Sequence, residues 1–194
     1  MLPILYNETY AIIINKRILL NINIMEQQKC YENYPIWMVI IANIISLSIY
    51  VIGGFIVYQI GLLWLVFYVC YIFVLEIKLL RGHCVDCYYY GKTCVFGKGR
   101  LSKLFFKRGE PKKFIDIKIT WKSVIPDFLV SVVPIIVGVV ILVMNFNWLI
   151  LLLIIMLFLL GFSGNALVRS QLACKYCKQR ELGCPAQKLF DKNK

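Results

Sequence analysis

Charged side chains are absent from two long stretches of this 194-residue chain. No Asp, Glu, Lys or Arg occurs in residues 36–75 or in residues 128–168, about 40 residues in each case. This absence, in a chain that is 60% hydrophobic, excludes an ordinary soluble domain. A single helix of that length would extend over roughly 60 Å, about twice the hydrocarbon core of a bilayer. Each stretch therefore predicts a hairpin of two membrane-spanning helices.

Turn-forming residues interrupt each stretch near its middle and locate the tips of the hairpins. Gln59 and Gly61 interrupt the first stretch, and Asn145 and Asn147 interrupt the second. The predicted spans are residues 36–58, 62–80, 126–145 and 148–168. The predicted fold class is an all-α integral membrane protein. Its four transmembrane helices form two tandem, parallel hairpin repeats, each followed by a small cytoplasmic Cys-rich loop.

Acidic residues are scarce, with 10 Asp and Glu against 22 Lys and Arg. Residues 76–127 hold 12 basic against 5 acidic side chains, and residues 169–194 hold 7 against 2. The positive-inside rule makes these regions cytoplasmic and predicts a multi-pass protein of the cell membrane with both termini in the cytoplasm. Anionic lipid headgroups are the expected neighbours. Because membrane proteins commonly carry such an excess, it does not indicate a nucleic-acid partner.

The first residues of the chain differ in composition from the rest. Lys16 and Arg17 break an apolar stretch too early for the core of a signal peptide. Our hypothesis is that translation starts at Met25. The predicted organisation is an N-terminal segment, a first repeat, a basic interfacial linker and a second repeat, at residues 1–34, 35–98, 99–125 and 126–194.

Equal spacings in the two halves indicate an internal duplication. Pro35 precedes the first hairpin and lies 49 positions before Cys84, and Pro126 precedes the second and lies 48 positions before Cys174. Each hairpin is followed by a C-x2-C-x6-C triplet. Two parallel repeats would be related by an axis along the membrane normal, which would bring the triplets together at one end of the bundle. The candidate metal ligands are Cys84, Cys87, Cys94, Cys174, Cys177 and Cys184.

The triplets have the chemistry of a metal site. The C-x2-C spacing allows two thiolates to reach one metal, and flanking basic residues are expected to lower the pKa of the thiols. Three cysteines are one short of a closed tetrahedral site. His83 could complete the first triplet, but Ala173 holds the matching position in the second. An iron–sulfur cluster using four of the six thiolates, a zinc ion held across both halves and a two-metal site all remain open. Disulfides are the alternative, which a reducing cytoplasm disfavours.

Polar residues gather at the cytoplasmic ends of the predicted spans. They could form a polar floor beneath the cysteines or only mark interfacial ends and helix packing. Between the repeats, residues 97–113 carry apolar and basic side chains at helical spacing, which predicts an amphipathic helix on anionic lipid, with a solvated loop as the alternative. The floor residues are Asn43, Ser46, Tyr50, Glu76, Lys78, Asp127, Asn165 and Arg169.

No catalytic Ser/His/Asp set or pair of catalytic carboxylates is evident, and Asp86 stands where a P-loop around Lys92 would need glycine. The leading hypothesis is a metal or iron–sulfur protein that passes electrons between the membrane and a cytoplasmic redox partner. Alternatives are a membrane enzyme for a lipid-like substrate with a structural zinc site, and a soft-metal transporter. Transport is the weakest, since the spans hold few soft ligands, among them Cys70, Met144 and Met156. A homo-oligomer is compatible with each reading.

Overall fold

The computed structural model describes residues 30–117 and 120–185, without the side chains of residues 121–123. The chain divides into two units, Met1–Cys30 and Tyr31–Lys194, and all the described helices belong to the second. Most of the predicted N-terminal segment lies outside the described residues. Met25, the predicted start of translation, lies outside them too.

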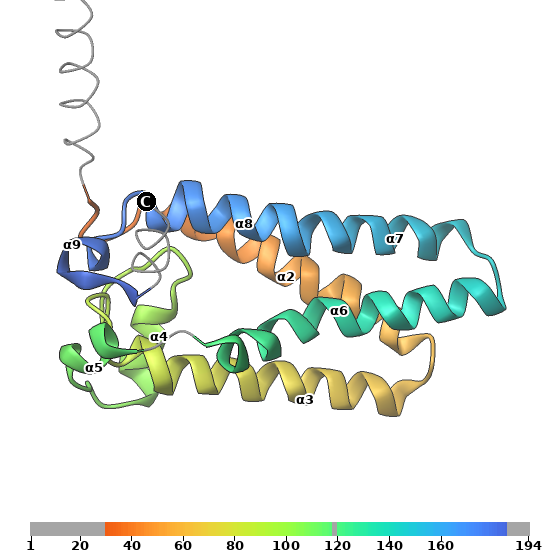
Figure 1. Cartoon of the computed structure of the whole chain (residues 1–194), viewed down its shortest axis with the longest axis horizontal. Helices are drawn as coiled ribbons and strands as arrows, with labels where there is room; N and C mark the ends of the chain where they lie inside the picture. Colours follow the sequence, from red (N-terminus) through yellow and green to blue (C-terminus); the bar gives the residue numbers. More distant parts are fainter. Residues whose placement is uncertain (1–29, 118–119, 186–194) are drawn as a thin grey trace, which may run out of the picture. The chain divides into compact units, whose positions relative to one another are not determined.

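Four long apolar helices dominate the second unit, and no β-strand occurs in the described residues. Each helix is long and apolar enough to cross a membrane, over Ile36–Tyr58, Leu62–Cys84, Val124–Met144 and Trp148–Cys174. The predicted all-helical class and the four predicted spans are confirmed at this level. Figure 1 shows the long helices running along the same axis, with the shorter helices α4, α5 and α9 at one end.

The first hairpin is built from α2 (Ile36–Tyr58) and α3 (Leu62–Leu79), which continues as the π-helix η1 (Leu80–Cys84). The turn between the helices falls at the predicted place, where Gly61 has a φ of 150° that disfavours a side chain. The second hairpin consists of α6, α7, η2, α8 and η3, which cover Trp121–Met144, Trp148–Phe158, Leu159–Gly164, Asn165–Leu167 and Val168–Cys174.

Two of the helices extend beyond the predicted spans. The helices that contain the spans predicted at 62–80 and 148–168 both continue to the first cysteine of a triplet, Cys84 and Cys174. Those ends were predicted from the onset of charged residues. Charge stops a chain from remaining in hydrocarbon, but Lys and Arg are good helix formers and do not stop a helix. Each triplet therefore begins on the end of a continuous helix.

Apolar packing and several hydrogen bonds between helices hold the long helices together, and one of these bonds compensates for a proline. α2 packs against α3, α6 and α7. Pro134 interrupts the ladder of α6, because it has no N–H to donate to the carbonyl of Val130. The hydroxyl of Tyr68 on α3 donates to that carbonyl at 2.9 Å instead. The hydrogen bond from Tyr68, which replaces the bond missing within α6, therefore fixes α3 against α6.

Three short helices lie outside the spans. They are α4 (Lys98–Phe105), α5 (Pro111–Asp116) and α9 (Gln179–Gly183). α4 falls within the segment that the sequence predicts to be an amphipathic helix. Leu104 and Phe105 on α4 are exposed, as that prediction requires, while its contact with lipid stays a prediction.

Candidate functional site

Two loops follow the helices, the first cysteine loop between Cys87 and Cys94 and the second between Cys177 and Cys184. These two loops contact each other directly. The backbone N–H of Tyr88 donates to Oε1 of Gln179 at 2.7 Å, and the backbone N–H of Lys178 donates to the hydroxyl of Tyr89 at 3.0 Å. Gln179 and Tyr89 are buried, with 4% and 3% of their surface exposed. Residues between Cys87 and Cys94 thus bind residues between Cys177 and Cys184, so each loop supplies one side chain to the backbone of the other.

The segment just before α2 connects the two loops a second time. Tyr34 hydrogen-bonds to the first loop and to the residue just before the second triplet. Its N–H donates to the carbonyl of Thr93 at 2.9 Å, and its hydroxyl donates to the carbonyl of Ala173 at 2.6 Å. The N–H of Tyr31 donates to the carbonyl of Tyr176 at 3.0 Å. Residues 31–34 therefore hold the first loop against the end of the second hairpin.

Aromatic rings fill the space between the loops. Tyr34 and Tyr89 have ring centroids 5.5 Å apart, and Tyr31 and Tyr176 have centroids 5.2 Å apart. This tyrosine cluster also contacts Cys87 and other half-buried residues of both loops. It gives the cysteine loops a small apolar core of their own, which sequence spacing did not reveal. The signal available was the abundance of tyrosine near the triplets.

The six triplet cysteines, all of them described, are free thiols and form no disulfide. Burial, together with the neighbouring thiols of Cys84, Cys94 and Cys184, raises the pKa of the Cys87 thiol to about 11. Burial likewise raises the pKa of Cys177 to about 12, with added effects from Cys87 and Cys184. Thiols of the two halves are therefore close enough to influence one another. The expectation of lowered pKa values is wrong for Cys87 and Cys177, because the effect of burial exceeds that of the backbone hydrogen bonds that favour the thiolates.

Within the described part of the chain, no set of three or more His, Cys, Asp or Glu side chains is arranged to hold a metal ion. Five of the six triplet thiols are half-buried and that of Cys174 is exposed. The Sγ atom of Cys94 accepts a hydrogen bond from the N–H of Gly99 at 3.3 Å. His83 is half-buried and lines the same cavity as Cys184 of the other half. The predicted ligands thus lie in one region without converging.

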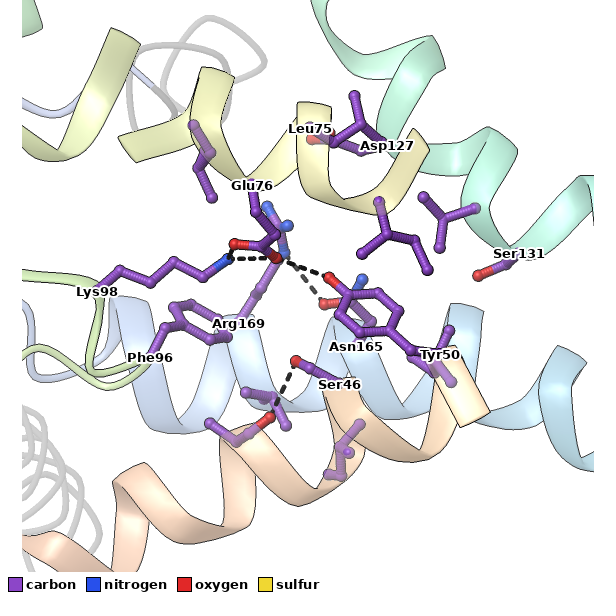
Figure 2. A pocket seen from close by; sticks show the side chains of 17 residues that line it. Ser46, Tyr50, Leu75, Glu76, Phe96, Lys98, Asp127, Ser131, Asn165 and Arg169 are labelled. Atoms are coloured by element: carbon purple, nitrogen blue, oxygen red, sulfur yellow. Dashed lines mark hydrogen bonds and ion pairs between the residues drawn. The ribbon is translucent and has the colours of Figure 1, made fainter. Parts of the chain in front are cut away.

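A polar cavity of about 130 Å³ lies between the helices beside these loops. Figure 2 shows its charged and polar side chains, which come from α2, α3, α4, α6, α8 and η3. The cavity brings together all but two of the predicted floor residues, namely Ser46, Tyr50, Glu76, Asp127, Asn165 and Arg169. Lys78 does not line the cavity and is exposed. Asn43 is also exposed, and its Nδ2 donates to the carbonyl of Val39 within its own helix at 2.7 Å.

An ion pair missed by the sequence analysis lies at the centre of this cavity. Nζ of Lys98 lies 2.7 Å from Oε2 of Glu76, and the hydroxyl of Tyr50 donates to Oε1 of the same carboxylate at 2.8 Å (Figure 2). Lys98 begins α4, four residues after Cys94. Its pairing ties the end of the first cysteine loop to α3, and only the folded chain brings these two residues together.

No family model, curated protein or solved structure matches this chain. The case for a function therefore depends on the chemistry of the residues themselves.

Proposed function

We propose that the two cysteine triplets together form one thiolate site, which binds a metal ion or an iron–sulfur cluster at the end of the helical bundle. The observation that carries this proposal is the pair of hydrogen bonds between the loops. Each triplet alone is one ligand short of a closed four-ligand site. Two loops that hold each other through buried side chains can supply the remaining ligand from the opposite half.

Reciprocal contacts also support the proposal that the halves are tandem, parallel repeats. When Cys84 is matched to Cys174, Tyr88 matches Lys178 and Tyr89 matches Gln179. The backbone N–H of Tyr88 binds the side chain of Gln179, and the backbone N–H of Lys178 binds the side chain of Tyr89. The two bonds therefore join matching positions of the two copies. Such an exchange is the pattern that a two-fold axis produces. A π-helix precedes both triplets, which agrees with the same relation.

The ligands proposed for the metal are the six triplet cysteines, with His83 as a further candidate. Because no three of them converge, the loops must close around the metal for it to bind. Thiolates bind metal and thiols do not, so loading at neutral pH would release protons. Zinc or an iron–sulfur cluster fits this set of soft ligands, and zinc would also accept an imidazole in place of one thiolate.

Electron transfer is the function that such a cluster would serve best here. The proposed orientation, with the basic loops in the cytoplasm, supplies a reducing compartment in which thiols stay available. Cys174 is the exposed member of the set and marks the side on which a cytoplasmic redox partner could approach. A membrane enzyme with a structural zinc site is a second candidate, favoured by the polar cavity beneath the loops.

Transport of a soft metal gains no support from the spans. Cys70 is exposed on α3, and Met144 and Met156 are 75% and 43% exposed. In a bilayer these side chains would face lipid, so they cannot relay an ion through the bundle.

Anaerobic purification of the full chain, with elemental analysis and an absorption spectrum, tests the proposal. We expect bound iron with a reducible visible band, or stoichiometric zinc without colour. Cys87→Ser and Cys177→Ser should each abolish metal binding, while Cys70→Ser, the matched control, should leave it intact. A protein without metal whose six thiols all react freely with an alkylating reagent would contradict the proposal.

The contact between the loops can be tested with Gln179→Ala. This change leaves the buried N–H of Tyr88 without its acceptor, so the loops should hold each other less firmly and metal affinity should fall about tenfold. Gln171→Ala removes an exposed glutamine from the helix before the same loop and serves as the control. Equal metal affinity in the two variants would show that the loops act separately.

A further inference from the structure

A second, larger cavity adjoins the polar cavity. It measures about 620 Å³. It is lined by residues of α6, η2 and α8 on one side and by residues of α5 and the end of the second cysteine loop on the other. The two cavities share five lining residues, Leu79, Asp127, Ser131, Asn165 and Arg169. Leu79 belongs to α3, and the four polar residues come from α6, α8 and η3, so the second hairpin supplies the polar part of the shared wall. We call the larger cavity the lateral pocket.

Aromatic side chains line the outer part of the lateral pocket. Phe128 and Phe162 have ring centroids 5.8 Å apart and are 47% and 38% exposed. Both belong to helices that are long and apolar enough to cross a membrane. In a bilayer their exposed faces would therefore meet acyl chains. The pocket thus combines an apolar side open to lipid with a polar inner wall.

Two charges on the shared wall lack an ionic partner. Among the described residues the ion pairs are Lys98 with Glu76 and Lys113 with Glu110, and neither includes Asp127 or Arg169. Arg169 uses its Nε to donate to Oδ1 of Asn165 at 3.1 Å. Its terminal nitrogens remain available as donors. Both residues are exposed and flank the charge-free stretch 128–168, so they lie where the spans meet the headgroup layer and can pair with charged lipid headgroups.

We propose that the lateral pocket binds the headgroup of a zwitterionic membrane phospholipid that carries a phosphate and a primary ammonium. The phosphate accepts hydrogen bonds from the guanidinium of Arg169, and the ammonium donates to the carboxylate of Asp127. The acyl chains leave past Phe128 and Phe162 into the bilayer. A pocket of 620 Å³ is in the usual range for small molecules, about 300–1,000 Å³, and holds a headgroup and glycerol but not a whole lipid.

Charge complementarity selects this lipid class over the alternatives. An anionic headgroup without an amine satisfies Arg169 and places negative charge beside Asp127. An amphiphile without charge satisfies neither side chain. Only a headgroup with both signs matches both residues of the wall, and guanidinium is well suited to phosphate. The inference does not depend on the proposed metal site, since none of its steps involves a metal.

The test uses the full chain in detergent micelles, titrated with short-chain phosphatidylethanolamine or phosphatidylglycerol and measured by native mass spectrometry. The amine-bearing lipid should bind about tenfold more tightly, as expected for one charged hydrogen bond. Asp127→Asn should remove this difference, and Arg169→Gln should weaken binding of both lipids about tenfold. Arg100→Gln, which removes an exposed charge on α4 away from the pocket, should change neither.

A variant that keeps every charge guards against a failure to fold. Ala166 lines the lateral pocket and is exposed, so Ala166→Trp fills the pocket from its open side and should abolish lipid binding. Equal affinity of the wild-type protein for the two lipids would overturn the inference, and so would undiminished binding in Ala166→Trp. Metal content measured on the same samples reports separately on the proposed metal site, because Asp127→Asn should leave it unchanged.

Discussion

The thiols of Cys87 and Cys177 lie in surroundings that favour their protonated form. Burial raises their pKa values to about 11 and about 12, against about 8.5 for an ordinary thiol. The folded protein therefore holds these protons more tightly than the unfolded chain does. The resulting stabilisation is fully present below about pH 8.5 and is lost as the pH rises through 11 to 12.

Alkylation should show this shift. After treatment with a chelator, Cys87 and Cys177 should react with iodoacetamide at pH 7.5 at least a hundredfold more slowly than the same residues in the denatured chain, because the thiolate is the reactive form. The rate for Cys87 should keep rising with pH until about pH 11. Peptide mass spectrometry gives the rate for each residue. A rate that levels off near pH 9 would contradict the shift.

A single hydroxyl replaces the hydrogen bond that Pro134 removes from α6. Tyr68→Phe leaves the carbonyl of Val130 without a donor and should destabilise the protein by about 1 kcal/mol. Unfolding by SDS in mixed micelles measures the change. Tyr58→Phe, at a half-exposed tyrosine at the end of α2, is the control. In a Pro134→Ala background, where the helix supplies its own N–H, Tyr68→Phe should cost less. An equal cost in both backgrounds would rule out this explanation.

At the scale of elements, one ion pair joins α4 to α3. The side chains of Lys98 and Glu76 are 21% and 29% exposed, whereas those of Lys113 and Glu110 are 68% and 72% exposed. Lys98→Met should destabilise the protein by about 1–3 kcal/mol, since it leaves a partly buried carboxylate unpaired. Lys113→Met breaks an exposed pair and should cost well below 1 kcal/mol.

The same unfolding measurement distinguishes an effect of the pair from an effect of the lysine side chain alone. Glu76→Gln combined with Lys98→Met removes both charges and should recover part of the stability lost in Lys98→Met. If the double variant is less stable than Lys98→Met by the full cost of Glu76→Gln, the two residues are not coupled.

The elements differ in how far the sequence predicts them. The four long helices follow from the two stretches without charged residues. A chain with such apolar stretches can satisfy its backbone hydrogen bonds in a bilayer only as helices. The extension of two helices to Cys84 and Cys174 was missed, since local charge sets membrane depth and not helix length. Lys98 falls in the basic segment 97–113, and no sequence signal pairs it with a glutamate 22 positions earlier.

At the scale of the whole molecule, spacing carries more information than residue identity. The matched triplets predict that the halves correspond, although the side chains that join the loops differ, with Tyr89 in one loop and Gln179 in the other. Their hydrogen bonds could not be predicted, because each depends on the shape of the opposite loop. The tyrosine cluster was missed for the same reason, since it brings together three segments that are distant in sequence.

The proposal of one shared site makes a prediction about stoichiometry that two separate sites would not satisfy. If ligands come from both halves, the protein should bind one metal ion or one cluster per chain, and loss of either loop should abolish all of it. Cys87→Ser and Cys177→Ser should then have the same effect, with no half-loaded protein. Metal-to-protein ratios and native mass spectrometry measure this. A variant that keeps half of the metal would instead show that each hairpin binds its own, and the hydrogen bonds between the loops would then serve packing alone.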